Sequence, residues 1–353
     1  MKADEIDKNF ASDKEFGDET VIGYQLPCAP FSMYGVFYDD KEKRFMRIPK
    51  TVAENTSEGC VVLMRHTSGG RIKFSTDSDT ISIKATYDYI FEMSHMPMTG
   101  SVGFSLIDET DGCELVYAFR PEQSDKTGFT ASAPALKKGV RNYVLYMPLY
   151  NDVISLAIGL KKGSFLGEGK PYKNIKPVLY YGSSITQGGC ASRPDNSYPA
   201  IVSKWTDTDF INMGLSGNAK AEPAIVGYLS SLACSVFVCD YDHNAPDKAY
   251  LEKTHLPLYL TFRAAQPDVP IVFLTKPDPE RDKNAVKRRQ VIRATYDYAV
   301  NRGDKNVYFI DGSTFFGRKD REICTVDGTH PNELGFYKMA KTVYKILSRI
   351  FDN

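Results

Sequence analysis

The residues of this chain best suited to catalysis are a serine, a histidine and an aspartate in its C-terminal half. Ser184 follows a glycine and another serine, and Asp327 stands three residues before His330. A serine hydroxyl is a weak nucleophile until an imidazole takes its proton. The imidazole in turn needs a carboxylate to fix its tautomer and stabilise its charge. These residue types indicate acyl transfer from a serine.

Acyl transfer also needs preorganised N–H donors for the oxyanion of the tetrahedral intermediate. Two turns between the serine and the histidine offer them. Gly217 lies in the turn Gly-Leu-Ser-Gly-Asn, and Asn244 lies in Tyr-Asp-His-Asn-Ala-Pro. A glycine turn can aim a backbone N–H, and an asparagine amide can donate from its side chain. Both turns therefore offer donors of the kind that acyl transfer needs.

The elements that position these residues alternate between strand and helix. Apolar strands are predicted at 178–181, 210–213, 235–240, 271–275 and 307–310. Helices are predicted at 196–206, 219–231, 247–266 and 283–302, with a last one from about 336 to 350. Buried strands with helical crossovers indicate a five-stranded parallel sheet, doubly wound. Ligands bind beyond the carboxyl ends of such strands, which is where the candidate residues stand.

The N-terminal half has a different period. Residues 81–87 alternate apolar and polar side chains, and we expect 70–74 to pair with them through the turn at 77–79. Another hairpin is predicted from 104–106 and 115–117. Many short strands with regular turns indicate a β-sandwich. The predicted domains are an acidic lead-in segment (1–20), a β-sandwich (21–160), a linker rich in Gly, Lys and Pro (161–176) and a catalytic domain (177–353).

The C-terminal motifs resemble those of the SGNH (GDSL-type) hydrolase family, which is named after its Ser, Gly, Asn and His. Gly-Ser-Ser-Ile-Thr around Ser184 looks like the first block, usually Gly-Asp-Ser, and the other blocks follow around Gly217, Asn244 and His330. The resemblance runs from Pro177 to the C-terminus and implies a flavodoxin-like domain. A sandwich before it is similar to bacterial two-domain, carbohydrate-esterase-like hydrolases with a jelly-roll-like module. Their Gly-x-Asp-Leu-Tyr element corresponds to Gly-Phe-Ser-Leu-Ile at 103–107, which lacks the Asp and the Tyr.

The resemblance implies a role for each residue. Ser184 attacks the ester carbonyl, His330 is the general base and then the acid, and Asp327 orients His330. The N–H groups of Ser184 and Gly217 and the side-chain amide of Asn244 hold the oxyanion. We also assign a substrate contact to Arg193, in the loop after the nucleophile, and expect neither metal nor organic cofactor.

The function implied is a serine esterase that removes acetyl or another short acyl group, with a carbohydrate as the expected ester substrate. A thioesterase or a deacylase of a small metabolite would use the same chemistry. A catalytically inactive carbohydrate-binding protein is the alternative from another class. It is kept open by Ser183, which stands where the common first block has Asp.

Simpler interpretations exist for several of these residues. Ser183 or Ser184 could be the nucleophile, and the following Ile-Thr favours Ser184. A lone serine at this place is more often a helix N-cap, and His330 could merely lead into the last helix. Asn244 could be a turn former before Ala-Pro. Asp242 replaces the glycine that usually stands two residues before that asparagine.

Composition limits the classes of partner. Lys plus Arg and Asp plus Glu number 44 each, and a nucleic-acid binder usually shows a basic excess. No stretch approaches 18 apolar residues, so we expect no membrane span. The N-terminus lacks the apolar region of a signal peptide, which predicts a cytoplasmic protein, or a periplasmic or secreted one if a leader was trimmed. Seven unevenly spaced cysteines predict free thiols. Nothing in the sequence indicates an oligomeric state.

Overall fold

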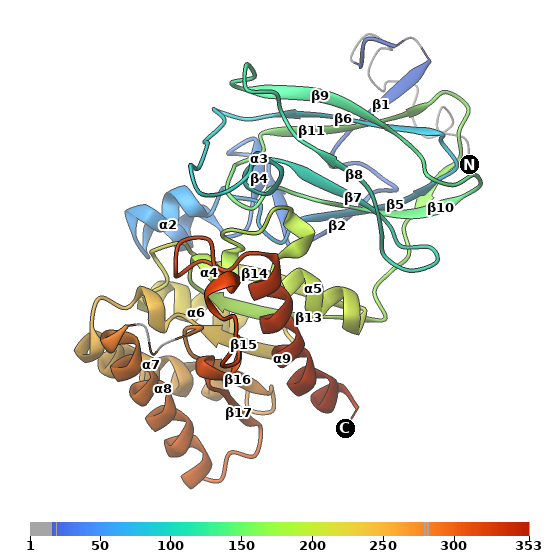
Figure 1. The fold of residues 1–353 in the computed structure, drawn as a ribbon. Coiled ribbons are helices and arrows are strands. Elements are labelled where there is room, and N and C mark those ends of the chain that lie inside the picture. Colours follow the sequence, from blue (N-terminus) through green and yellow to red (C-terminus); the bar gives the residue numbers. More distant parts are fainter. Residues whose placement is uncertain (1–15, 19, 279, 281, 353) are drawn as a thin grey trace. The chain divides into compact units, whose positions relative to one another are not determined.

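The computed structural model describes residues 16–18, 20–278, 280 and 282–352 (Figure 1). The chain forms two compact units. The sandwich unit comprises Met1–Arg47, Arg65–Tyr172 and Ser192–Asp195, and the parallel-sheet unit comprises Ile48–Met64, Lys173–Ala191 and Asn196–Asn353. Most of the predicted acidic lead-in, 1–20, lies outside the described residues.

The sandwich unit contains two antiparallel sheets. The four-stranded sheet has the order β1 (Val21–Gln25), β11 (Ser155–Lys161), β6 (Thr80–Thr86), β9 (Gly128–Pro134). The six-stranded sheet has the order β12 (Leu166–Glu168), β5 (Arg71–Thr76), β10 (Arg141–Tyr146), β7 (Phe104–Asp108), β8 (Glu114–Phe119), with β2 (Ser32–Tyr34) beside β5. The short pair β3 (Phe37–Asp39) and β4 (Arg44–Met46) and helix α3 (Met98–Ser101) complete it. Inward side chains of both sheets share one buried core, as expected of a β-sandwich.

One of the two hairpins predicted in this unit is confirmed and the other is wrong. β7 and β8 pair antiparallel, as predicted. β5 and β6, the strands predicted to pair, lie in different sheets, so residues 77–79 carry the chain from one sheet to the other. Ile72 and Phe74 therefore meet Ile81 and Ile83 in the core between the sheets. The period-two pattern is the same for a hairpin and for such an arch, which is why the sequence did not separate them.

The predicted linker, 161–176, is largely structured. β11 extends to Lys161, and β12 pairs antiparallel with β5 through Leu166–Glu168. The first strand of the parallel sheet already begins at Asn174. Glycine and proline in this stretch mark turns around a short edge strand rather than a free connection.

The parallel-sheet unit confirms the predicted five-stranded sheet. Its order is β14 (Thr208–Gly214), β13 (Asn174–Gly182), β15 (Val236–Asp240), β16 (Ile271–Leu274), β17 (Val307–Ile310), and every pair is parallel. In chain order this is 2-1-3-4-5, the flavodoxin-like arrangement. The helices are α4 (Ser184–Gln187), α5 (Tyr198–Thr206), α6 (Pro223–Ser231), α7 (Lys248–Ala265), α8 (Lys283–Asn301) and α9 (Glu333–Phe351).

Neighbouring side chains at the end of β13 show that both faces of this sheet are covered. Tyr180 packs edge-on against Tyr198 of α5, with ring centroids 5.6 Å apart. The next residue, Tyr181, accepts a hydrogen bond from Ala221 N–H, just before α6. Because successive residues of a strand point to opposite faces, α5 and α6 lie on opposite sides of the sheet. The strand order changes direction at β13, because β14 lies on one side of it and the later strands lie on the other. Ligands of such sheets bind in the crevice at the carboxyl end of this strand.

A segment from the N-terminal half belongs to the parallel-sheet unit. Residues Ile48–Met64, inside the range predicted for the sandwich, form α1 (Lys50–Glu54) and α2 (Glu58–Leu63), and α1 packs near α6. Gly59 of α2 lies so close to Asn218 that a Cβ atom at Gly59 would stand 2.1 Å from Asn218 Oδ1. The segment thus adjoins the turn that carries Gly217.

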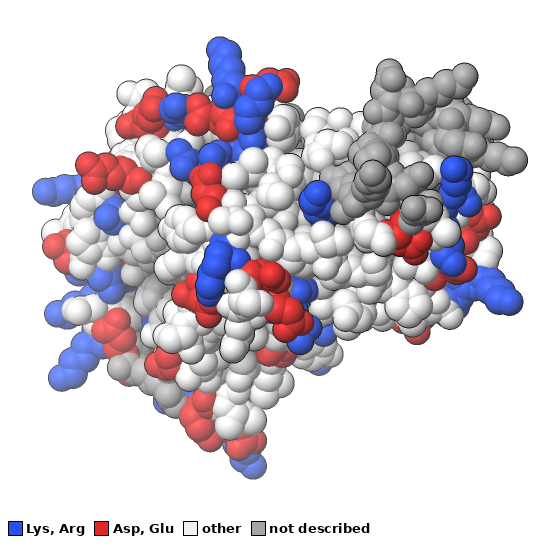
Figure 2. Space-filling view, turned by 90° about the horizontal axis from the view of Figure 1, so that it is seen from above, with Lys and Arg blue, Asp and Glu red and all other residues white. Residues whose placement is uncertain are grey.

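Two surface properties follow from the described residues. None of the helices that the structure describes has the length and apolar character needed to cross a bilayer. On the face drawn in Figure 2, the basic side chains are interspersed with acidic ones rather than gathered into a field of one sign.

Candidate active site

The nucleophile turn, residues 182–187, begins at the last residue of β13 and includes the short helix α4. Ser183 is the N-cap of α4, and its hydroxyl oxygen accepts a hydrogen bond from Ile185 N–H at 3.2 Å. Ser184 is the first helical residue, and its Oγ lies 2.9 Å from Nε2 of His330. The structure therefore gives the capping role to Ser183 and directs Ser184 at the imidazole.

The histidine loop, residues 325–332, holds the imidazole and its carboxylate. His330 Nδ1 lies 2.7 Å from Asp327 Oδ2, and Asp327 Oδ1 accepts the backbone N–H of His330 at 2.7 Å. Burial opposes ionisation of Asp327, but the hydrogen bonds from His330 and Thr329 outweigh it and lower the pKa to about 2. With Nδ1–H donated to this carboxylate, Nε2 is left to accept the Ser184 hydroxyl proton.

The loop is fixed at both ends. Thr325 and Pro331 form an isolated β-bridge, and Asn332 caps α9 by accepting Gly335 N–H at 3.2 Å. His330 therefore stands outside the helix, and the helix entry begins only at Asn332. Cys190 N–H donates to Pro331 O, which ties the loop to the segment after α4.

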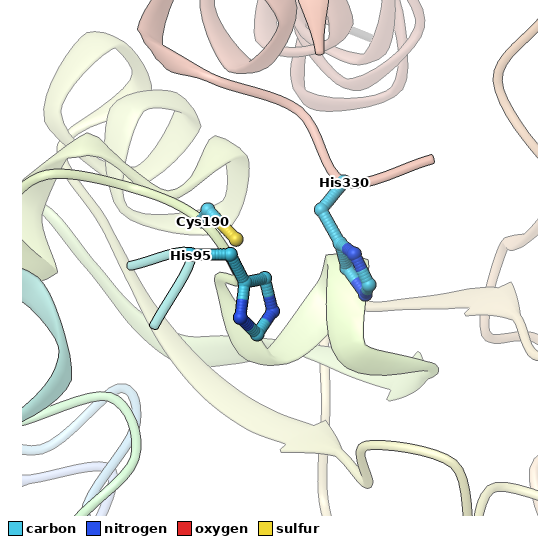
Figure 3. Close-up of side chains that lie close together, drawn as sticks. All are labelled: His95, Cys190 and His330. Carbon is cyan, nitrogen blue, oxygen red and sulfur yellow. The ribbon is translucent and has the colours of Figure 1, made fainter. Parts of the chain in front are cut away.

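A thiol lies beside the imidazole. Cys190 Sγ is within 4.8 Å of a ring nitrogen of His330, and Figure 3 shows both side chains. Burial, with the carboxylates of Asp327 and Glu333 nearby, raises the pKa of the Cys190 thiol to about 12. A neutral thiol is a poor nucleophile, so the arrangement favours the Ser184 hydroxyl.

The two predicted oxyanion donors lie on adjoining turns. Gly217 has φ +69°, in the left-handed region that favours glycine, and a Cβ there would meet open space. Within the described part of the chain its N–H has no acceptor. Asn244 Oδ1 accepts Ala219 N–H at 3.3 Å, which fixes the side chain and leaves its NH2 group to donate elsewhere.

A buried carboxylate that no motif in the sequence indicated lies beneath the nucleophile turn. Asp240, the last residue of β15, accepts hydrogen bonds from Thr186 Oγ1, from Tyr198 Oη at 3.2 Å and from Ser183 N–H at 3.4 Å. Burial raises the pKa of Asp240 to about 7, although the hydrogen bond from Thr186 lowers it. The signal in the sequence is a charged residue that ends an otherwise apolar strand.

Asp242, the departure from the usual third block, is also buried. Its Oδ2 accepts Lys276 N–H at 3.2 Å, so it joins the loop after β15 to the end of β16. Burial raises its pKa to about 6. The carboxylate thus holds together the loop that presents Asn244.

Arg193 is the one predicted site residue outside the parallel-sheet unit. It belongs to the short stretch Ser192–Asp195 assigned to the sandwich unit, and its Nε donates to Asp195 Oδ1 at 3.1 Å. Its contact with substrate stays a prediction. The structure brings together the other five predicted side chains or turns at one edge of one sheet.

Comparison with known families agrees with this geometry. The profile of the GDSL-like lipase/acylhydrolase family matches residues 175–348, and that of GxDLY, the N-terminal domain of SGNH-hydrolase-type esterases, matches residues 26–166. No curated protein sequence matches the chain.

Solved structures match nearly the whole chain. A GDSL-like lipase from Bacteroides ovatus is 25% identical with a TM-score of 0.84, covering 94% of this chain and 98% of its own. SsfX3, a salicylyl-acyltransferase from a tetracycline biosynthetic pathway, is 16% identical with a TM-score of 0.77 over 94% and 98%. The acetyl xylan esterase Est2A from Butyrivibrio proteoclasticus is 12% identical with a TM-score of 0.58 over 94% and 99%. With its fold, its site and both family profiles in agreement, this chain belongs to the SGNH (GDSL-type) hydrolases, in their two-domain form, and is a carboxylic ester hydrolase.

Proposed function

We propose that this esterase uses Ser184, His330 and Asp327 as a catalytic triad to hydrolyse short acyl esters, with acetyl groups on a carbohydrate as the expected substrate. The observation that carries the proposal is one continuous hydrogen-bonded chain. Ser184 Oγ lies 2.9 Å from His330 Nε2, and His330 Nδ1 lies 2.7 Å from Asp327 Oδ2. This is the relation of nucleophile, base and orienting carboxylate that acyl transfer requires.

In the first half-reaction, His330 Nε2 takes the Ser184 proton as Oγ bonds to the carbonyl carbon. The resulting imidazolium is stabilised by Asp327, whose lowered pKa keeps it ionised at neutral pH. The imidazolium then protonates the leaving alcohol as the ester C–O bond breaks. Water repeats the sequence on the acyl-enzyme, releasing the carboxylic acid and restoring the Ser184 hydroxyl.

In each half-reaction the carbonyl oxygen becomes an oxyanion. The donors proposed for it are the N–H groups of Ser184 and Gly217 and the amide NH2 of Asn244. Asn244 is held for this by Ala219 N–H on its Oδ1, and Gly217 by its left-handed backbone. Losing one such donor costs about 2.7–4 kcal/mol of transition-state stabilisation in comparable sites.

The substrate is proposed from the named activity of a protein with a similar fold. Est2A, which shares the fold over nearly the whole chain, is named as an acetyl xylan esterase. A saccharide ester with a small acyl group is therefore the first substrate to try. Esters of longer acyl groups and thioesters are alternative substrates that the same acyl-enzyme chemistry would hydrolyse.

The test compares wild type, Ser184→Ala and Ser183→Ala with p-nitrophenyl acetate, followed by acetate release from acetylated saccharides. Ser183 is the matched control, because it is a neighbouring serine whose hydroxyl accepts a backbone N–H instead of facing His330. We expect Ser184→Ala to reduce kcat to background and Ser183→Ala to keep most of it. Wild-type activity no higher than the background of Ser184→Ala, with every ester tried, would favour an inactive carbohydrate-binding protein.

A second candidate is acyl transfer to an alcohol instead of water. It is favoured by the fold shared with SsfX3, which is named a salicylyl-acyltransferase and has a TM-score of 0.77. Both reactions share the acyl-enzyme and differ only in the acceptor. Turnover of p-nitrophenyl acetate with rising concentrations of a sugar alcohol separates them: an acetylated acceptor indicates transfer, and free acetate alone indicates hydrolysis.

A further inference from the structure

Asp240 lies directly beneath the nucleophile turn. In the register of the parallel sheet it pairs with Gly182, the residue at which β13 ends and the turn begins. A Cβ atom at position 182 would stand 1.9 Å from Asp240 Oδ1 and 2.2 Å from Thr186 Oγ1. The absence of a side chain at Gly182 is what allows the carboxylate to reach the turn.

The carboxylate binds the turn on both sides of Ser184. Ser183 N–H and the Thr186 hydroxyl both donate to Oδ1, and they come from the residue before Ser184 and from the second residue after it. Oδ2 accepts from Tyr198 on α5. One acceptor oxygen is thus shared by two donors of the turn, and the other oxygen joins the turn to α5, a largely buried helix.

The turn has no carboxylate of its own. Ser183 stands where the common first block has Asp, and its hydroxyl serves only the N-cap. Asp240 supplies a carboxylate from the neighbouring strand instead. We propose that Asp240 is a positioning residue for the esterase reaction, holding the turn so that Ser184 Oγ meets His330; this inference rests on the proposed role of Ser184.

The free energy needed to bury the Asp240 carboxylate indicates that the residue has a role beyond filling space. Asp240 is 7% exposed, and an ionised carboxylate is expensive to bury without a full cationic partner. The groups bonded to it are neutral hydroxyls and one backbone N–H. An apolar side chain would fill the same place at less cost, but it could not align the donors on both sides of Ser184.

The first test is Asp240→Asn, which keeps the shape but replaces one acceptor oxygen by a donor. Misplacing a catalytic group by about 1 Å costs on the order of 10²-fold. We expect kcat on p-nitrophenyl acetate to fall roughly 10- to 100-fold while KM changes less than about threefold, because only the alignment of the reacting groups is lost. A kcat within about threefold of wild type would overturn the inference.

Two further variants distinguish positioning from general stability. Thr186→Val removes a donor on the turn, whereas Tyr198→Phe removes the donor on α5, and both lose one hydroxyl to the same carboxylate. We expect Thr186→Val to lower kcat severalfold and to be non-additive with Asp240→Asn. Tyr198→Phe, whose lost hydroxyl also lies 3.3 Å from Thr186 Oγ1, should lower kcat less, because it leaves both donors of the turn bound to Asp240. Equal losses of kcat in both variants, tracking their melting temperatures, would show that the network only stabilises the fold.

Ser184→Ala is run alongside so that the two proposals fail separately. Loss of activity in Ser184→Ala with full activity in Asp240→Asn rejects the role of Asp240 and leaves the triad standing. Full activity in Ser184→Ala rejects the triad itself. The rate at which an organophosphate labels each folded variant gives a second readout, since it reports the reactivity of Ser184 without a turnover cycle.

Discussion

The nucleophile turn and the histidine loop meet at one hydrogen bond but are built in opposite ways. Ser183 and Ser184 are 1% and 6% exposed, whereas the side chains of His330 and Asp327 are 22% and 36% exposed. The turn is held by a residue 54 positions away along the chain, Asp240. The catalytic pair of the loop is held by hydrogen bonds over three residues or fewer, which Thr329 N–H, His330 N–H and the His330 ring donate to Asp327.

This difference separates chemistry from stability. A substitution in the exposed loop removes a reacting or orienting group and disturbs few buried contacts. A substitution in the turn changes a buried network as well as the position of the nucleophile. We therefore expect substitutions of the reacting side chains in the loop to lower activity with little change in stability. Substitutions that disturb the buried network around the turn should change both activity and stability.

The largest effect is expected in the loop. His330→Ala should lower kcat to the level of Ser184→Ala, because both remove a member of one catalytic unit. Asp327→Asn should cost about 10⁴-fold, since an amide favours the wrong imidazole tautomer. Steady-state kinetics with p-nitrophenyl acetate measures the losses, and thermal melts of the same preparations should stay close to wild type. A fall in melting temperature as large as that of a turn variant would break the comparison.

Asn244→Ala should come next. Removing one oxyanion donor typically lowers kcat by about 10²–10³-fold. Asn218→Ala is the matched control, because Asn218 lies on the neighbouring turn and its amide donates to Ser216 O instead. Equal kcat for both variants would show that Asn244 only shapes its loop.

The two glycines of these segments sharpen the comparison. Gly182→Ala puts a methyl group against Asp240 and Thr186, and overpacking of this kind costs about 1–3 kcal/mol. Gly328→Ala meets open space and only strains a backbone at φ +84°, at about 1–2 kcal/mol. We expect both variants to have a lower free energy of unfolding, measured by denaturant titration. The loss of kcat should be greater in Gly182→Ala. The opposite order of kcat would mean that the turn tolerates displacement better than the loop.

The same contrast explains what the sequence could predict. Asp327 and His330 are three residues apart, so their pairing is readable from the chain itself. The five strands were found because each is a short apolar run followed by a turn, and the helices between them predict that the strands run parallel. Gly217 and Asn244 were readable because each sits in a turn directly after such a run.

The network of Asp240, Thr186 and Tyr198 was not readable, because it joins three elements through side-chain directions that no local pattern records. The sandwich shows a similar limit. The alternation in β5 and β6 identifies two strands with one apolar face each, but it is equally satisfied by a hairpin within one sheet and by an arch between two sheets. The assignment of Ile48–Met64 to the parallel-sheet unit likewise depends on tertiary packing, which the local sequence does not record.

The smallest expected effect concerns stability against pH. The pKa of Asp240 is raised by burial from its ordinary value near 4 to about 7, so the folded state holds a proton that the unfolded state has already lost between those values. Stability falls with rising pH wherever the folded state binds more protons. Asp240 therefore does not destabilise the folded state below about pH 4, destabilises it progressively more up to about pH 7, and destabilises it by a constant amount above that pH.

Asp240→Asn removes this dependence, so its melting temperature relative to wild type should improve by a few degrees between pH 4 and pH 8. Asp242, with a pKa raised to about 6, stays in both proteins, and its charge contributes to the raised pKa of Asp240. A variant that gains stability at pH 8 while losing kcat there would show that the turn retains a destabilising buried carboxylate because it aligns Ser184; a constant difference across the pH range would show that Asp240 does not titrate there.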